Sequence, residues 1–300
     1  MRRLLPLLIL APLMATAPTR RTVLAMGTSL TWEGMAPASA QARAFAAVEA
    51  LEARCSTWRP ESLWSRLNAG DAVALPAEDL DLLRRVAALS RQVDGAFDPV
   101  LGRLIEAWGL RRGGLTPDPE ALGAARRASG LDLLELGAEG ARLRNGAWLE
   151  EGGFLKGRAL DLAAAELRAG GARSGLLDFG GQLLAWGPAR RVALADPADR
   201  QRPRLTIRLR NASLSTSGTS ERGRHILDPR TGQPCPAWGA VAVLRPSGLE
   251  ADVLSTALYV LGPDRGLAWA EAHGVAAVFL PLEGPVRMSS AFRSHHPRRP

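Results

Sequence analysis

The chain has 300 residues, of which 46% are hydrophobic, a composition that suits a packed globular core and excludes a disordered or fibrous protein. The formal net charge is +8 and the pI is near 11, but arginines and acidic residues are interspersed along the whole chain and only 5% of the residues are aromatic. No DNA- or RNA-binding motif accompanies this charge, so we expect no nucleic acid among the partners.

The N-terminus has the pattern of an export signal. Arg2 and Arg3 form a positive region, residues 4–13 are apolar, and Ala15-Thr16-Ala17 offers a small-x-small cleavage site, although Pro18 would follow the cut. We expect a signal peptide over residues 1–22, a single domain over residues 23–300 and a periplasmic location. Retention of an uncleaved leader at the inner membrane stays open.

Helices are predicted mainly in the first half of the chain, where apolar residues recur at helical spacing. The expected ranges are 42–54, 78–92, a short helix between 117 and 130, and 154–169. Strands are predicted at 175–179, 182–186, 192–195, 205–209, 241–244 and 275–280, with one more helix at 251–261. This separation of helices and strands predicts an α+β fold.

Two rare residue types are informative. Lys156 is the single lysine among 38 basic residues, which indicates either chance or a site that needs a compact point charge. Cys55 and Cys235 are the two cysteines; an oxidising compartment would permit a disulfide, but two cysteines this far apart establish no disulfide framework, and we expect both to be free and buried. The histidines His295 and His296 lie in a basic, proline-rich tail that we expect to be disordered.

A glycine-rich segment precedes the helix that carries Lys156. In Glu150-Glu151-Gly152-Gly153-Phe154-Leu155-Lys156-Gly157, two glycines stand at the helix start and the lysine lies in its first turn. Exposed backbone N–H groups at a helix N-terminus suit a phosphate, and glycine permits close approach of a ligand. An ordinary loop with a solvent-facing lysine is the alternative.

Two further polar clusters follow. His225 comes shortly after Ser215-Thr216-Ser217-Gly218 and can accept or donate a proton, or be an ordinary loop histidine. Asp252, Ser255 and Thr256 lie on a predicted helix, where positions four apart share a face. Such oxygen ligands suit Mg²⁺, whereas an inward-packed threonine beside a helix-start aspartate is the alternative.

Seven segments resemble, in their sequences and in their order, those of the ApbE family of FAD:protein FMN transferases. The resemblance runs from Met26-Gly27-Thr28 nearly to the C-terminus. Residues 55–68 are similar to the family's "LSTYRPDS…LN", residues 95–102 to "GAFDPTVG" and residues 108–109 to "WG". The remaining matches are residues 152–161 with "GGIAKGYAVD", 178–187 with a "GG" hairpin, 215–232 with "ATSG…HIIDPRTG", and 251–258 with "ADALATAL".

This resemblance implies a single compact ApbE/T-fold-like domain with a mostly antiparallel sheet and flanking helices. It also implies Mg²⁺-dependent transfer of the FMN half of FAD to a Thr or Ser hydroxyl of an acceptor protein, commonly a subunit of a membrane redox complex, with release of AMP. The implied catalytic residues are His225, Asp252 and Lys156. The implied metal ligands are Gly153 (through its carbonyl), Asp252, Ser255 and Thr256. The implied FAD contacts are Met26, Trp58, Ala96, Phe97, Asp98, Glu150, Lys156 and Ile226.

The chain departs from the family pattern at several positions. Glu150 stands where the family usually has Asp, Val100 replaces a Thr, Arg224 replaces the first histidine of a common pair, and the loop before His225 is short. A non-catalytic periplasmic FAD-binding protein remains an alternative, favoured if the short loop before His225 abolishes transfer. A FAD pyrophosphatase is the other alternative that the resemblance implies, since water can replace the acceptor hydroxyl. The acceptor protein is not named by the sequence.

Overall fold

The computed structural model describes residues 19–218 and 225–298, and its centre is an eight-stranded sheet whose paired strands are all antiparallel. In spatial order the strands are β1 (Thr19–Ala25), β2 (Thr28–Gly34), β6 (Gly175–Phe179), β7 (Gln182–Trp186), β10 (Ala212–Gly218), β13 (Gly239–Arg245), β14 (Ala276–Pro281) and β15 (Arg287–Met288).

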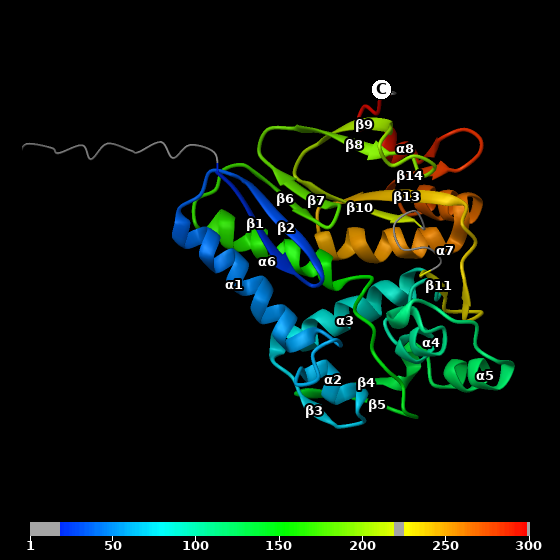
Figure 1. Cartoon of the computed structure of the whole chain (residues 1–300). Coiled ribbons are helices and arrows are strands. Elements are labelled where there is room, and N and C mark those ends of the chain that lie inside the picture. Colours follow the sequence, from blue (N-terminus) through cyan, green and yellow to red (C-terminus); the bar gives the residue numbers. More distant parts are fainter. Residues whose placement is uncertain (1–18, 219–224, 299–300) are drawn as a thin grey trace, which may run out of the picture.

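Three helices cover one face of this sheet: α1 (Ala38–Cys55), α6 (Leu155–Ala169) and α7 (Gly248–Ala272) (Figure 1). Their apolar sides pack on the main core, to which the sheet contributes residues such as Trp32, Leu177 and Val243. The α7 helix begins at the N-cap Ser247 and is kinked at Gly262, which precedes Pro263. Burial of these apolar stripes is the principal driving force that holds helices and sheet together.

The opposite face of the sheet carries a hairpin and a short helix. Strands β8 (Arg190–Ala195) and β9 (Pro203–Leu209) pair with each other, and together with α8 (Ser290–Arg293) they lie above the sheet in Figure 1. Leu205, Ile207 and Phe292 form a second core with the outward side chains of the sheet. The sheet is therefore buried on both faces over much of its area.

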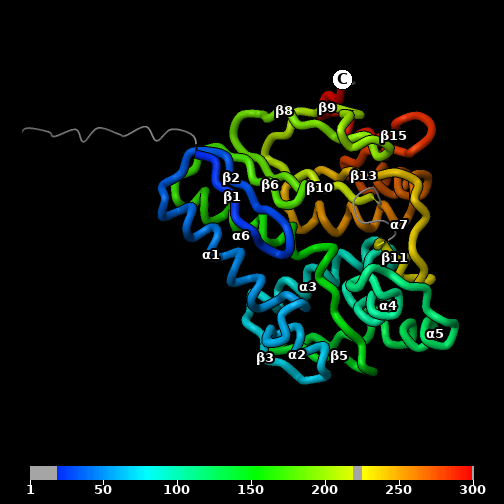
Figure 2. The backbone as a smooth tube through the Cα atoms, in the orientation of Figure 1, coloured from blue at the N-terminus to red at the C-terminus, as the bar shows by residue number. Residues whose placement is uncertain are grey.

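The remaining elements lie together beyond the ends of α6 and α7 (Figure 2). Most of them belong to the segment between the end of α1 and the start of α6. They are α2 (Leu63–Asn68), β3 (Val73–Ala74), α3 (Ala77–Gln92), α4 (Gly102–Ala107), η1 (Leu110–Arg112), α5 (Pro119–Arg127), η2 (Leu131–Leu133), β4 (Leu134–Leu136), β5 (Gly140–Leu143), β11 (Leu227–Asp228) and β12 (Gln233–Pro234).

The α+β fold and the predicted helices are confirmed, but two expectations are wrong. Strands also occur early, because β1 and β2 form an N-terminal hairpin within residues 19–34. The helix expected at 251–261 is confirmed as the first part of α7, which begins at Gly248 and continues to Ala272 beyond the kink at Gly262. The C-terminal tail is ordered as far as Arg298, whose backbone pairs with Thr206 of β9.

The leader expected over residues 1–22 falls mostly on residues 1–18, outside the described residues, and β1 begins at Thr19. Cys55 and Cys235 are both free and buried, as expected. Within residues 19–218 and 225–298, no helix is both long and apolar enough to cross a membrane.

Candidate active site

A cavity of about 880 Å³ lies where the first turn of α6, the second and third turns of α7 and the end of β10 meet the loops around α4, η1 and β11. All but two of the site residues predicted from the sequence line it, and these are Trp58, Ala96, Phe97, Asp98, Glu150, Gly153, Lys156, His225, Ile226, Asp252 and Thr256. They come from distant parts of the chain, so their convergence supports a common site.

Met26 and Ser255 are the two that do not line the cavity. Met26 occupies the tip of the β1–β2 hairpin with φ of 47°, and its N–H donates to Glu52 Oε2 at 3.1 Å. Ser255 has no exposed surface, and its hydroxyl lies 3.1 Å from Ser215 Oγ and donates to the Asp252 carbonyl at 3.0 Å. Ser255 therefore lies behind the cavity wall, and the role as a metal ligand that the resemblance implies for it stays a prediction.

Asp252 is held at the crossing of α6 and α7. The N–H of Gly157 donates to Asp252 Oδ2 at 3.0 Å, and Ser215 Oγ lies 3.5 Å from Oδ1. Burial raises the pKa of Asp252, while the charge of Lys156 and these hydrogen bonds act in the opposite direction. A buried carboxylate without a strong cationic partner favours a bound cation when it is ionised.

The two helices cross closely enough to permit this bond because both carry glycine at the contact. A Cβ on Gly157 would lie 2.2 Å from the Gly248 carbonyl oxygen. Asp161, one turn along α6, accepts hydrogen bonds from Ser247 Oγ at 2.7 Å and from the Gly248 N–H at 2.6 Å. A carboxylate at a helix N-terminus satisfies free N–H groups and fixes the start of α7, the helix that bears Asp252.

Hydroxyl groups from β10 and α7 surround Asp252. Ser217 Oγ lies 2.9 Å from Ser255 Oγ and 3.4 Å from Thr256 Oγ1, and Thr256 Oγ1 donates to the Asp252 carbonyl at 3.2 Å. Ser215 and Ser217 were part of a polar cluster in the sequence but were not predicted as site residues. Their alternate spacing was the available signal, because residues i and i+2 of a strand share a face.

The donor set around Asp252 is consistent with Mg²⁺. One carboxylate, the Thr256 hydroxyl and the backbone of Gly153 supply hard oxygen atoms, and Mg²⁺ completes its shell with waters and substrate phosphates. A Cβ on Gly153 would lie 3.6 Å from Thr256 Oγ1, so this backbone runs beside the threonine. Within the described residues, no group of three or more His, Cys, Asp or Glu side chains forms the kind of site that zinc prefers.

Lys156 extends the site toward the glycine segment. It lies in the first turn of α6 and lines the cavity, and its Nζ donates to the Gly152 carbonyl at 3.1 Å. Glycines 152 and 153 also border the cavity. An ammonium group, a helix N-terminus and a glycine backbone therefore face the same space, as a phosphate site requires.

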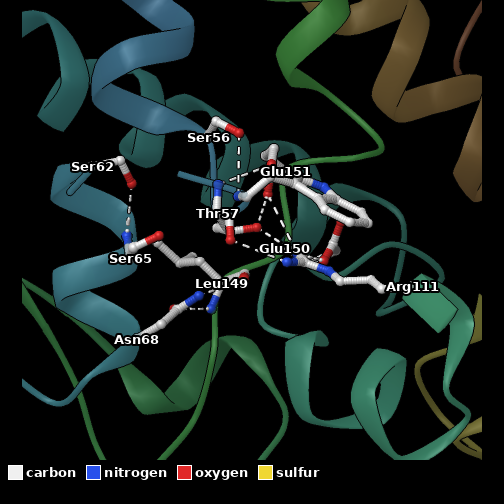
Figure 3. Close-up of polar contacts among 10 residues, drawn as sticks. Ser56, Thr57, Ser62, Ser65, Asn68, Arg111, Leu149, Glu150 and Glu151 are labelled. Carbon is white, nitrogen blue, oxygen red and sulfur yellow. Dashed lines mark hydrogen bonds and ion pairs between the residues drawn. The ribbon is translucent and has the colours of Figure 1, made fainter. Parts of the chain in front are cut away.

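Arg111, which sequence reasoning missed, organises another wall of the cavity (Figure 3). Its Nη1 donates to the Thr57 carbonyl at 3.1 Å, and its Nη2 donates to Glu150 Oε2 at 2.5 Å and to the Thr57 hydroxyl. The guanidinium also stacks 4.4 Å from the ring centroid of Trp58, a side chain that is 63% exposed. Arg111 thereby positions both Trp58 and Glu150 at the cavity.

Glu151 lies behind this wall. Thr57 donates to it through its N–H at 3.0 Å and through its hydroxyl at 2.5 Å. Burial, and then the charge of Glu150, raise the pKa of Glu151. Arg111 partly offsets that repulsion because its Nη2 lies 3.9 Å from Glu151 Oε2. No simple sequence signal identified Arg111, since the chain contains many arginines.

Asp98 and His225 lie on two loops of the cavity. Both carboxylate oxygens of Asp98 accept backbone N–H groups, from Val100 at 2.7 Å and Leu131 at 2.8 Å, and burial raises the pKa of this carboxyl. Asp98 therefore orders its loop as well as lining the cavity. His225 borders the cavity just before β11. Arg224 and the short loop before it lie outside the described residues.

Known proteins share this fold and are related to the chain in sequence. The structure is similar to the apo flavinyl transferase ApbE of Pseudomonas stutzeri, with a TM-score of 0.85, 32% identity and coverage of 93% of this chain and 96% of that one. It is also similar to the flavin transferase ApbE of Vibrio cholerae, with a TM-score of 0.86, 25% identity and coverage of 93% and 99%.

A curated FAD:protein FMN transferase of Rhodobacter capsulatus is 33% identical over 89% of this chain, which spans 56% of that protein's length. A second, from Klebsiella pneumoniae (strain 342), is 28% identical over 85% of this chain and 81% of its own length.

The fold and the cavity, taken with these relatives, define an enzyme of the flavin transferase class. The sequence profile of the ApbE family matches residues 26–279, and the chain belongs to this family.

Proposed function

We propose that this chain transfers the FMN moiety of FAD to a Thr or Ser hydroxyl of an acceptor redox protein, with Mg²⁺ and with release of AMP. The observation that carries this proposal is the convergence of Asp252, Thr256 and Lys156 on one cavity. These residues combine a cation site with a phosphate site, and the cavity volume is in the range of pockets that hold large organic ligands.

The chain's residues fit the requirements of phosphoryl-type transfer, which depends on positioning and charge neutralisation more than on covalent help. Lys156 and the N-terminus of α6 would bind the FAD pyrophosphate. Trp58, Glu150 and Phe97 would position the rings and sugar groups along the cavity walls. When bound by Asp252, Thr256 and Gly153, Mg²⁺ would supply neutralisation of the phosphate charge.

The reaction exchanges one bond for another at the FMN phosphorus. The acceptor hydroxyl oxygen forms a P–O bond, the P–O bond to the bridging oxygen breaks, and AMP leaves with that oxygen. His225 lies at the cavity and would accept the proton of the acceptor hydroxyl. In this scheme, the cationic side chain of Lys156 would lie close to the negative charge that develops on the departing AMP phosphate.

We also propose that the enzyme acts in the periplasm, on a subunit of a membrane redox complex. The N-terminal pattern of two arginines, an apolar run and small residues supports export. A cut near Ala17 would leave β1, which begins at Thr19, intact.

The test combines the purified chain with FAD, Mg²⁺ and a candidate acceptor from a neighbouring gene. Transfer requires stoichiometric AMP together with FMN bound covalently to the acceptor through its Thr or Ser. Release of AMP with free FMN alone would indicate a pyrophosphatase. FAD binding without AMP release would indicate a binding protein and would reject the proposal.

A further inference from the structure

Gln182 presents an unpaired acceptor atom near Asp252. The side chain opens β7 directly after the Gly180–Gly181 turn, is only 4% exposed and lines the cavity. Its Nε2 donates to the Gly248 carbonyl at 2.9 Å and lies 3.3 Å from Ser213 Oγ. Because a carbonyl oxygen can only accept a hydrogen bond, the nitrogen must face Gly248, and the orientation of the amide is determined.

The oxygen of this amide is therefore the atom left without a partner. Across the described residues, Gln182 Oε1 is the one buried side-chain oxygen that makes no hydrogen bond, the other such atoms being indole nitrogens. Leaving a buried acceptor unpaired costs about 1–3 kcal/mol, and native proteins rarely tolerate it away from a functional site.

The surroundings identify the kind of partner that is missing. Gly248, to which the amide nitrogen is bonded, lies one helical turn before Asp252 in α7. Gln182, Ser215 and Asp252 all border the same cavity. Phosphate oxygens are acceptors and would repel Oε1, so this atom needs a donor or a cation. Mg²⁺ usually keeps several waters, and each of these waters is a strong donor.

We propose that Gln182 belongs to the metal site as a positioning residue, with Oε1 accepting a hydrogen bond from a water of the divalent cation bound at Asp252. This inference rests on the metal site of the proposed function and adds a residue from the sheet to ligands that come from α7 and the glycine segment. Outer partners of this kind orient the inner shell and commonly contribute about tenfold or more to metal affinity.

The experiment measures Mn²⁺ binding to the full chain without FAD, by the loss of the free Mn²⁺ electron paramagnetic resonance signal. Gln182→Met keeps the length of the side chain but removes the acceptor together with the Nε2 donor to Gly248, and we expect about a tenfold weaker dissociation constant. Gln182→Glu loses the same donor to Gly248 but keeps an acceptor oxygen at the same reach, and it should bind Mn²⁺ at least as tightly as the native chain.

Gln41→Met is the matched control. Gln41 is also buried, and its Nε2 donates to the Ala36 carbonyl at 2.9 Å and to Thr19 Oγ1 at 3.1 Å, but it does not line the cavity. This variant should bind Mn²⁺ like the native chain, and thermal melts of all variants confirm folding.

The outcomes separate the two proposals. Asp252→Asn should lose Mn²⁺ binding, and if it binds normally the metal site itself is wrong. If Asp252→Asn loses Mn²⁺ while Gln182→Met binds as the native chain does, the metal site stands and the role of Gln182 is rejected. In that case Oε1 is satisfied by a structural water unrelated to the metal.

Discussion

The backbone N–H of Gly157 on α6 donates to the carboxylate of Asp252 on α7 across 3.0 Å, and this bond requires the two helices to cross almost backbone to backbone. Gly157→Ala would place a Cβ 2.2 Å from the Gly248 carbonyl oxygen. Because backbone atoms must then move, we expect a loss of about 2–3 kcal/mol in the free energy of unfolding and weaker Mg²⁺ binding.

Urea denaturation with and without Mg²⁺ measures both effects. Gly123→Ala is the control, because Gly123 is also helical but its added Cβ would meet only the end of the Arg127 side chain, at 3.5 Å. That control should be stabilised by about 0.5–1 kcal/mol. Equal changes in the free energy of unfolding for Gly157→Ala and Gly123→Ala would contradict the close crossing of α6 and α7.

Asp252→Asn should leave a folded protein that transfers no FMN. An asparagine oxygen can still accept the Gly157 N–H, so the helix crossing survives, but the carboxylate charge that holds the cation is removed. The measurement is AMP release together with the thermal shift caused by Mg²⁺. Persistence of a Mg²⁺-dependent reaction in this variant would remove Asp252 from the site.

Lys156→Arg should be nearly as damaging as Lys156→Ala for FMN transfer. The guanidinium is larger and planar, and it would crowd the glycine-lined space next to Gly152 and Gly153 although the charge is kept. FAD binding and FMN transfer are measured for both variants, with thermal melts to verify folding.

The exposed Arg43→Lys exchange is the surface control, and it should change stability by no more than about 0.5 kcal/mol. If Lys156→Arg transfers FMN at the native rate, the single lysine is an accident of composition, and phosphate binding depends on the α6 N-terminus and the metal.

Arg111→Lys should weaken FAD binding about tenfold, because a lysine cannot make the bonds to Thr57 and Glu150 while stacking on Trp58. Flavin fluorescence titration measures the dissociation constant. The adjacent Arg112 is exposed, and Arg112→Lys should bind FAD as the native chain does. Identical affinities for both variants would show that Arg111 does not shape the FAD site.

The mature protein should be found in the periplasm without roughly its first 17–22 residues, since a cleaved signal is expected there. Fractionation of the native host with mass spectrometry of the N-terminus tests this. A cytosolic protein that retains Met1 would overturn the expectation.

The local sequence was sufficient to predict the elements whose apolar residues recur with a clear period. The stripe of Leu80, Leu83 and Val86 predicted α3, and the paired glycines predicted the β6–β7 turn. By contrast, β10 was missed because Ser213 and Ser215 occupy buried strand positions that usually carry apolar residues. Their burial is stabilised only by hydrogen bonds to groups distant in sequence, such as Gln182, Ser255 and Asp252.

The sequence by itself determined the family resemblance and a set of site residues of which all but Met26 and Ser255 line the cavity. Short motifs with special residues such as Gly153, Lys156 and Asp252 can be recognised wherever they occur in the chain. Only the tertiary structure decided that Ser255 faces β10, that Arg111 supports Trp58, and that Gln182 has an unpaired oxygen. The physical reason is that hydrogen bonds depend on which atoms meet in space, and these atoms are often distant in the sequence. The two hydrogen-bond partners of the Gln182 amide nitrogen, Ser213 and Gly248, lie 31 and 66 residues from it along the chain.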